Sequence, residues 1–294
     1  MTLLVIGESL IDIVEQPDGT VVEHPGGSPF NVARGASRLG VATELATQLG
    51  PDDRGDILRQ ALDHDGVILS PGLHPLPSTS TARARLDETG AATYTFDLSW
   101  DPGALPDPGR YEAIHIGSLG AFLEPGASAV ADLVLSADVL GIPVSLDPNI
   151  RTSVSADQDA WNAAFARVCG HARLIKLSDD DAAVLAEDIA LATAAAELSF
   201  DGALVVVTRG AAGALMAQNG RALEIAAPSA RVVDTIGAGD SYMAALLAWF
   251  AMYDWPDIDE LDDTELRDLG EYAARAAAIT VSRPGADPPY LDEL

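Results

Sequence analysis

The stretch Asp234-Thr235-Ile236-Gly237-Ala238-Gly239-Asp240 places two glycines and a carboxylate directly before an apolar segment. Residues 230–233, which precede it, read Ala-Arg-Val-Val and predict a short strand. The apolar residues that follow recur at helical spacing, at Met243, Leu246, Leu247 and Phe250. Glycine permits positive φ, and the first N–H groups of a helix lack internal partners, so this turn can hold a phosphate group. The stretch therefore predicts a strand-to-helix turn suited to an anionic ligand.

Asp240 has two interpretations. A carboxylate in this turn can take the proton from a hydroxyl group that attacks a phosphate, which makes it a general base. Alternatively, Asp240 caps the helix and the glycines only form a tight turn. The stretch is neither of the common nucleotide motifs, because the chain has no G-x-x-x-x-G-K-[ST] and the third glycine of G-x-G-x-x-G is missing here. A second site is needed to choose between the two interpretations.

A second glycine-rich segment, Gly26-Gly27-Ser28-Pro29-Phe30-Asn31, lies near the N-terminus. Ser28 is a favourable helix cap and Pro29 a favourable first-turn residue, so we expect a helix to begin here. Its apolar stripe comprises Val32, Ala33, Ala36 and Leu39. Asn31 can exchange hydrogen bonds with sugar hydroxyls, while Gly26 and Gly27 allow the backbone to contact a ligand. Taken alone, the segment also fits an ordinary glycine loop before an ordinary helix.

Together, the two segments resemble the motifs of the ribokinase-like (PfkB) family of sugar and nucleoside kinases. They correspond to residues 26–40 and 234–240, in the family's order and separation, and the resemblance extends over nearly the whole chain. Two further patterns, Gly7-Glu8-Ser9-Leu10-Ile11-Asp12 and Asp147-Pro148-Asn149-Ile150-Arg151, resemble the fructokinase branch. The resemblance favours Asp240 as the catalytic base. We expect the backbone N–H groups of Gly237, Ala238 and Gly239 to stabilise the transferring phosphoryl group.

The hydrophobic pattern agrees with the fold that the family implies. Near-continuous apolar runs alternate with alanine-rich segments, at residues 3–6, 43–49, 113–116, 143–146, 173–177 and 203–208. They predict a mostly parallel sheet covered on both faces, a ribokinase-like three-layer α/β/α sandwich. Residues 11–22 and 81–96 alternate like hairpins instead. In the family such strands form a small lid over the sugar, so we expect one kinase domain over residues 1–294, with lid strands at about 11–23 and 81–98.

Three positions are candidates for contact with the sugar or the transferred phosphate. Asp12 is expected at the end of the first strand, where open α/β sheets bind ligands, and the resemblance implies that it accepts hydrogen bonds from sugar hydroxyls. Tyr94 and Phe96 alternate on a hairpin strand, so we expect only one of them to face the sugar, with Phe96 the candidate. Arg151 can hold an anionic oxygen in bidentate fashion, and by resemblance it lies near the phosphate or the sugar.

The nucleotide side rests on a weaker pattern. Residues 207–213 follow a strongly apolar run and match the family's Thr-x-Gly-x-x-Gly loop around ATP. The ATP-binding candidates are Lys176, Ser178, Thr208, Gly210, Gly213, Gly237 and Gly239. Two departures from the family occur: its Asn-x-x-Glu pattern reads Ser178 to Asp181 here, and Ala274 lies in the helix segment that often carries an adenine-side asparagine. These departures bear on the choice of nucleotide.

Metal ions are also implied by the resemblance. Mg²⁺ is expected with ATP, held through water by Asp147 and Asp181. A monovalent cation such as K⁺ is expected, by family analogy, near the carbonyl groups of Asp234 and Ile236. The five histidines show no metal-ligand spacing, and we assign none of them to catalysis.

Composition bounds the partners. The net charge of −28 argues against nucleic-acid and anionic-membrane partners, because the field of the whole protein repels both. The single cysteine excludes an intramolecular disulfide, and no segment is long and apolar enough for secretion or a membrane span, so we expect a cytoplasmic enzyme. Only one of the seventeen basic residues is a lysine, Lys176. The family further implies a homodimer that forms through the lid strands.

The sequence as a whole predicts an ATP-dependent sugar kinase. The predicted reaction transfers the γ-phosphoryl group to a primary hydroxyl of D-fructose, giving fructose 6-phosphate. A 2-keto-3-deoxygluconate kinase and a ribokinase are alternatives that would use the same residues. A sugar-binding sensor that keeps the fold without turnover is an alternative of a different class.

Overall fold

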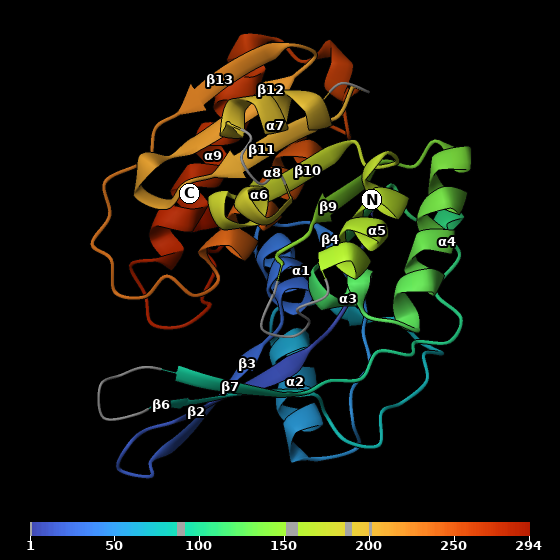
Figure 1. The fold of residues 1–294 in the computed structure, drawn as a ribbon, viewed down its shortest axis with the longest axis vertical. Helices are drawn as coiled ribbons and strands as arrows, with labels where there is room; N and C mark the ends of the chain where they lie inside the picture. Colours follow the sequence, from blue (N-terminus) through green and yellow to red (C-terminus); the bar gives the residue numbers. More distant parts are fainter. Residues whose placement is uncertain (1, 87–91, 151–157, 186–189, 200–201) are drawn as a thin grey trace.

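A nine-stranded sheet forms the centre of the molecule (Figure 1). The computed structural model describes residues 2–86, 92–150, 158–185, 190–199 and 202–294. From edge to edge the strands are β13 (Arg221–Ile225), β12 (Ala214–Gln218), β11 (Leu204–Thr208), β10 (Leu174–Ser178), β9 (Val144–Asp147), β8 (Ala113–Gly117), β1 (Thr2–Ile6), β4 (Ala42–Ala46) and β5 (Ile68–Leu69). All neighbouring pairs are parallel except β11–β12 and β12–β13, which are antiparallel. The mostly parallel sheet predicted from the apolar runs is confirmed.

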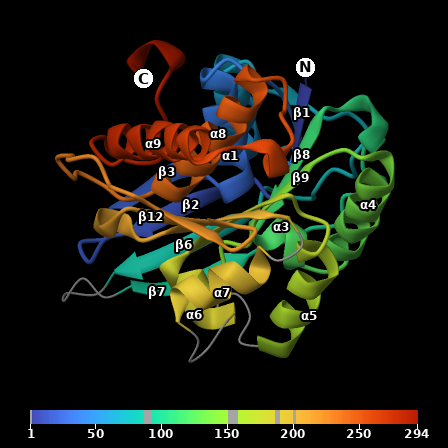
Figure 2. The same cartoon turned by 90° about the horizontal axis from the view of Figure 1, so that it is seen from above.

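Helices cover both faces of this sheet (Figure 2). One layer contains α1 (Ser28–Arg38), α2 (Asp53–His64), α8 (Ala238–Met252) and α9 (Asp263–Thr280). The other contains α3 (Ser118–Phe122), α4 (Gly126–Leu140), α5 (Gln158–Cys169), α6 (Asp179–Leu185) and α7 (Leu191–Leu198). Successive residues of β1 enter opposite cores, Leu3 and Val5 on one side and Leu4 and Ile6 on the other. This explains why the strands are apolar at almost every position, because side chains alternate between two buried faces.

Short 3₁₀ turns complete the described secondary structure. They are η1 (Pro108–Arg110), η2 (Gly210–Ala212), η3 (Ile258–Glu260) and η4 (Leu291–Glu293).

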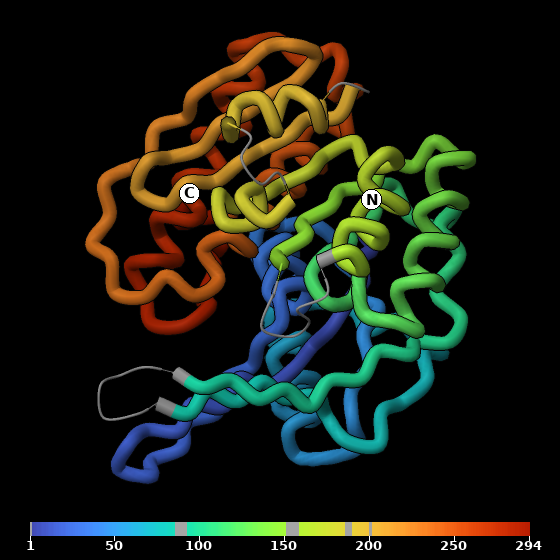
Figure 3. The backbone as a smooth tube through the Cα atoms, in the orientation of Figure 1, coloured from blue at the N-terminus to red at the C-terminus, as the bar shows by residue number. Residues whose placement is uncertain are grey.

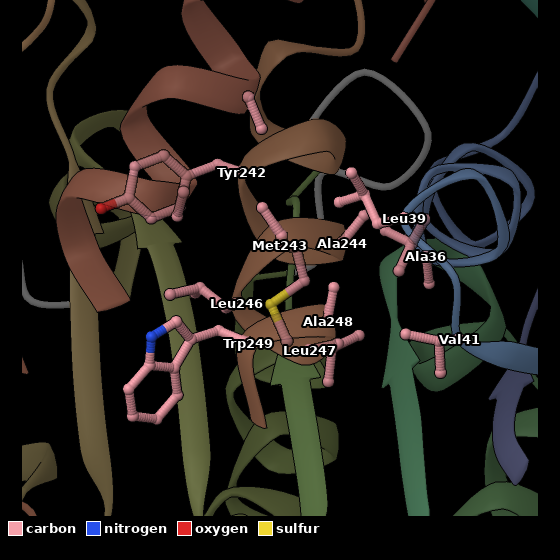
Figure 4. Packing of buried hydrophobic residues seen from close by; sticks show 14 of the residues in the cluster. Ala36, Leu39, Val41, Tyr242, Met243, Ala244, Leu246, Leu247, Ala248 and Trp249 are labelled. Carbon is pink, nitrogen blue, oxygen red and sulfur yellow. The ribbon is translucent and has the colours of Figure 1, made fainter. Parts of the chain in front are cut away.

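Helix α8 is buried on nearly all sides and packs closely against α1 (Figure 4). Figure 4 shows Ala244 on the side that faces Ala36 and Leu39, with Tyr242 on the opposite side. The two helices approach at Gly35, where an added Cβ would lie 2.7 Å from the Cβ of Ala244. This close contact brings the first turns of α1 and α8 together, although some 200 residues of sequence separate them.

A second sheet of four strands projects from the main body (Figure 3). Its order is β3 (Val21–Gly26), β2 (Leu10–Glu15), β6 (Thr81–Leu86) and β7 (Ala92–Asp97). The outer pairs are antiparallel hairpins, and β2 and β6 join them in parallel. Both predicted hairpins are therefore confirmed, except that residues 87–91, between β6 and β7, lie outside the described residues. We call this four-stranded sheet the lid sheet.

Three local predictions were wrong. Residues 230–233 form no strand; Val232 and Val233 are 63% and 54% exposed, and the Val233 N–H donates to the carbonyl of Val281 instead of to a sheet. Ser28 is not the cap of α1, because Gly27 holds that position at φ 104° and Ser28 is already helical. Asp12 does not end the first strand: β1 stops at Ile6, and Asp12 lies within the lid strand β2.

Candidate active site

The first turn of α8 meets the first turn of α1 through the carboxylate of Asp240. One carboxylate oxygen accepts a hydrogen bond from the Ser28 hydroxyl at 2.7 Å, and the other accepts one from the Asn31 amide nitrogen at 2.8 Å. Gly237 caps α8 without a side-chain hydrogen bond, so Asp240 does not serve as a helix cap. Of the two interpretations that the sequence left open, the geometry favours a carboxylate fixed in place by a second helix.

The glycines before Asp240 are required by the backbone. Gly237 has φ 75°, a left-handed conformation, and an added Cβ would lie 2.6 Å from the Cβ of Ala286. At Gly239 an added Cβ would lie 3.4 Å from the Lys176 ammonium nitrogen. Lys176, in the middle of the buried strand β10, therefore brings a cation to the start of α8, where the helix dipole also favours negative charge.

Lys176 forms a buried ion pair with Asp147. The ammonium nitrogen lies 2.9 Å from one carboxylate oxygen, and both side chains are almost fully buried. Burial raises the pKa of Asp147 to about 6, against the lowering effect of Lys176. Burial opposes the charge of Lys176, but Asp147, together with the charges of Asp181 and Asp240, outweighs burial and raises the pKa of Lys176. Within the described structure the second Asp147 oxygen is buried and accepts no hydrogen bond, so it is available to a ligand.

Ser178 and Asp181 form hydrogen bonds with each other at the start of α6. The Asp181 carboxylate accepts hydrogen bonds from the Ser178 backbone N–H at 2.9 Å and from the Ser178 hydroxyl at 2.6 Å. Its other oxygen accepts the Ile150 N–H at 2.7 Å. The pair therefore forms a local capping arrangement that also ties the segment after β9 to the end of β10.

The predicted nucleotide loop forms the turn between β11 and β12. Thr208 donates its hydroxyl to the carbonyl of Leu177 at 3.2 Å. Gly210 and Gly213 have φ values of 53° and 86°, and a Cβ added to Gly213 would lie 2.0 Å from the Ile225 carbonyl oxygen. Both glycines are thus explained by the turn, and their contact with a nucleotide stays a prediction.

On the lid sheet, Asp12 and Gly26 are closely packed. A Cβ added to Gly26 would lie 2.1 Å from an Asp12 carboxylate oxygen, so glycine makes room for this carboxylate. The register places Asp12 beside Ala82, and Ala82 beside Phe96, on one face of the lid sheet. Asp12 and Phe96 therefore lie on the same face.

Tyr94 and Phe96 were expected to point to opposite faces of the lid sheet, so that only one could face the sugar. This expectation was wrong. Tyr94 and Phe96 are two positions apart on β7, and side chains at that spacing share a face of a sheet. Their rings are stacked, with centroids 6.2 Å apart and an interplanar angle of 9°. Tyr94 is exposed and Phe96 is half-buried, so Phe96 lies closer to the main body.

The predicted role of Arg151 falls on residues 151–157, which lie outside the described structure. Asp234, the candidate for a monovalent cation, accepts the Ile236 N–H at 3.0 Å and the Gly285 N–H at 2.9 Å. The hydrogen bond from Ile236 lowers the pKa of Asp234. These contacts join the loop before α8 to the loop after α9.

The sequence analysis quoted Ser28 and Glu8 but did not place either residue in the candidate site. Ser28 was assigned to a helix cap, because its true partner Asp240 is 212 positions away and only the fold joins them. Glu8 was quoted only as part of a branch pattern. Its carboxyl is buried next to α3, and burial raises its pKa to about 7. An acidic residue directly after a buried strand is the signal that could have revealed it.

Comparisons with known proteins agree with this geometry. Residues 2–293 match the family described as pfkB family carbohydrate kinase. The chain is also 32% identical over 262 residues to a fructokinase of Klebsiella pneumoniae, covering 86% of this chain and 85% of the relative. The chain belongs to the pfkB carbohydrate kinase family. It is therefore a sugar phosphotransferase, and the alternative of a sensor without turnover is set aside.

Solved structures of this family share the fold. A fructokinase of Xylella fastidiosa with bound ATP has a TM-score of 0.85 at 25% identity, covering 99% of this chain and 96% of that one. An aminoimidazole riboside kinase of Salmonella enterica, complexed with aminoimidazole riboside and an ATP analogue, has a TM-score of 0.83 at 24% identity, with coverage of 100% and 98%. The three-layer ribokinase-like fold is confirmed. Because these neighbours act on different sugars, the fold alone does not name the acceptor.

The donor set also indicates how a divalent cation would be held. No group of three or more histidine, cysteine or acidic residues in the described ranges has the arrangement of a metal site. The buried, unpartnered oxygen of Asp147 fits a metal-bound water, as expected for Mg²⁺, which keeps several waters and is held largely by substrate phosphates.

Among the described helices none is long and apolar enough to span a membrane.

Proposed function

We propose that the protein is an ATP-dependent fructokinase that forms fructose 6-phosphate from D-fructose. The single observation that carries the kinase chemistry is the carboxylate of Asp240, fixed by Ser28 and Asn31 in the first turn of α8. The choice of fructose is supported by the relatives above 30% identity that bear that name.

In the proposed mechanism the chain supplies a base and oriented dipoles. Asp240 takes the proton from the primary hydroxyl of the sugar as that hydroxyl attacks the γ-phosphoryl group. The backbone N–H groups at Gly237, Ala238 and Gly239 stabilise charge on the transferring oxygens. When bound, Mg²⁺ neutralises charge on the phosphates of ATP, and Asp147 and Asp181 would hold its waters. Asp181 is already bonded to three donors, so Asp147 contributes the freer oxygen.

The sugar is proposed to bind between α1 and the lid sheet. Asn31 donates to Asp240, and its carbonyl oxygen is buried without a partner among the residues described, so it can accept a sugar hydroxyl. Asp12 and Phe96 share the lid face that would cover the ring. Gly26 and Gly27 leave room for the Asp12 carboxylate and the Glu8 carbonyl, and their backbone contact with the sugar stays a proposal from the sequence pattern. Arg151 stays a proposal from the sequence pattern alone.

For the nucleotide we propose a site that runs from Gly237 and Gly239 towards the β11–β12 turn. Lys176 lies beside Gly239 and would face the phosphates. Thr208, Gly210 and Gly213 would line the nucleoside end together with Ser178. A monovalent cation is proposed between the loops joined by Asp234 and Ile236; activity in K⁺ should exceed activity in tetramethylammonium.

We further propose a homodimer that forms through the lid sheets. The register groups Val14, Val22, Ala84 and Tyr94 on the same lid face as Asp12. Tyr94 is 56% exposed and Val22 is 38% exposed in the single chain. A second copy of the chain is the partner that the family resemblance suggests. Light scattering that gives a dimer mass, reduced by Tyr94→Glu, would support this proposal, and a monomer at micromolar concentration would contradict it.

The acceptor is tested with a panel of sugars. ADP release is followed with Mg·ATP and D-fructose, 2-keto-3-deoxygluconate, ribose or aminoimidazole riboside. Turnover with fructose at least tenfold above the others supports the proposal. The last compound is included because a neighbour of the same fold binds it, and preference for it would replace fructose as the substrate.

A further inference from the structure

Three backbone segments meet at the Gly27 cap of α1, the helix whose Ser28 bonds to Asp240, with little space between them. A Cβ added to Gly120 would lie 2.4 Å from the Gly7 Cα, and one added to Gly27 would lie 2.7 Å from the Glu8 carbonyl oxygen. The segment after β1, the loop before α1 and the turn into α3 are thus packed backbone to backbone. Any side chain in this junction is closely constrained by its neighbours.

Glu8 is the acidic residue of this junction. Its side chain is buried, and one carboxyl oxygen accepts the Gly120 N–H at 2.8 Å. A hydrogen bond from Ser118 lowers its pKa, but burial dominates and raises the pKa to about 7. Ser118 itself has φ 51°, a left-handed conformation that is uncommon for a residue other than glycine. The carboxyl of Glu8 therefore supports a strained turn.

The charge of Glu8 is coupled to that of the base. Burial is the main cause of the raised pKa of Glu8, and the charge of Asp240 adds to it. The two residues are linked through Gly27, which packs on the Glu8 carbonyl and directly precedes Ser28, the hydrogen-bond partner of Asp240. The Ser118 hydroxyl and the Gly120 N–H from α3 also act on the carboxyl, as does the backbone N–H of Glu8 itself, and all three groups are uncharged. The Gly26–Gly27 loop contributes only backbone to this side.

We propose that Glu8 is a positioning residue for phosphoryl transfer: its carboxyl holds the turn into α3 at this junction, and its proton controls how much negative charge lies there. This inference rests on the proposed role of Asp240. At low pH Glu8 is neutral and adds no charge to this region. At high pH Glu8 ionises, and its charge opposes the approach of the anionic triphosphate.

The negative charge that Glu8 gains at high pH should weaken the binding of ATP. As the pH rises from 6 to 8.5, the affinity for ATP should fall by about three- to tenfold in the wild type, as expected for one added charge near an anion site. Phosphate groups also lose a proton near pH 6, so the difference between wild type and variant, measured at the same pH, is the informative quantity.

The test is the pH dependence of nucleotide affinity in Glu8→Gln. Glutamine keeps an acceptor for Gly120 and cannot ionise. Calorimetric Kd values for the ATP analogue AMP-PNP with Mg²⁺ are compared for wild type, Glu8→Gln and the control Glu44→Gln. Glu44 is another buried carboxylate of the central sheet, bonded to Ser70 in a part of β4 away from this junction. We expect the wild type and the control to weaken with rising pH, and Glu8→Gln to lose the additional decrease.

A decrease that persists unchanged in Glu8→Gln would overturn the proposal. So would a uniform loss of affinity at every pH, which indicates a purely structural role. If Glu8→Gln does not fold, Ser118→Ala replaces it: removal of this hydrogen bond should move the transition to higher pH, and an unmoved transition contradicts the proposal. Because nucleotide binding needs no sugar turnover, a wrong acceptor shows up only in the sugar panel and leaves this test intact.

Discussion

The change Asp240→Asn separates the chemistry of the site from its architecture. Asparagine has the shape of aspartate, and its amide can reproduce both contacts in one orientation. Its carbonyl oxygen accepts the Asn31 amide, and its NH₂ group donates to the Ser28 hydroxyl, which can reverse its own role. The fold should therefore persist, with a loss of stability below about 1 kcal/mol, comparable to one ordinary hydrogen bond.

The loss of turnover should be far larger. An amide cannot take the proton of the attacking hydroxyl, and a general base contributes about 10²–10⁴-fold in rate. This corresponds to roughly 3–5 kcal/mol in the barrier. Single-turnover quench experiments with Mg·ATP and fructose measure the chemical step directly, while calorimetry measures sugar binding. We expect sugar affinity within about threefold of wild type.

A matched control is available in Asp56→Asn. Asp56 also lies in the first turn of a helix, but its side chain is exposed and pairs with Arg59 at 2.8 Å. This variant should keep wild-type turnover. Near-native single-turnover rates in Asp240→Asn would refute the assignment of the base, whereas lost sugar binding would show that Asp240 mainly binds the substrate.

Three further predictions concern stability and affinity. Gly237→Ala should lower stability by about 1–3 kcal/mol and weaken ATP binding, because φ is 75° and Ala286 leaves no room; thermal unfolding and KM for ATP measure both. Lys176→Met should destabilise by about 3–5 kcal/mol in urea, because Asp147 stays buried without its cation, and adding Asp147→Leu should restore stability without restoring activity. The folded pKa of Glu8 is raised from 4.5 to about 7, so its favourable contribution is complete below pH 4.5 and is lost as the pH rises through 7. Relative to wild type, Glu8→Gln should therefore gain roughly 3 kcal/mol between pH 4.5 and 8, measured by urea unfolding; a constant difference would contradict the raised pKa.

Much of the fold could be predicted because its physics is local. Strands buried on both faces must be apolar at almost every position, and that pattern is visible in β1, β10 and β11. Residues 230–233 show the limit of this reasoning. Two β-branched valines favour an extended backbone, but a strand needs a neighbouring strand. Here the available partner is the carbonyl of Val281, the residue that ends α9.

Parts of the candidate site could be predicted where the type of a single residue indicates its chemistry. Contacts between residues far apart in the sequence could not be predicted, because only the fold brings those residues together. Asp240 and Asn31 became candidates because a carboxylate and an amide stood in glycine-rich first turns, and their roles stay predictions. The contact between Ser28 and Asp240 depends on the approach of Gly35 to Ala244, which no local pattern encodes. A serine before a proline looks the same whether its hydroxyl caps its own helix or bonds to another one.

The strong acidity of the chain opposes the binding of a nucleotide, so the local charge of this site matters for its function. The protein carries a net charge of −28, yet it must bind a nucleotide that is itself anionic. The charge of each acidic group around Asp240, the proposed base, is offset in a different way. Asp147 is matched by Lys176, which is the chain's one lysine. Asp181 accepts hydrogen bonds from Ile150 and Ser178, and Asp240 accepts them from Ser28 and Asn31, while burial raises the pKa of Glu8 to about 7. With these charges locally offset, the dipole at the start of α8 can act on a phosphate over a short range, where the distant surface charge is screened by salt.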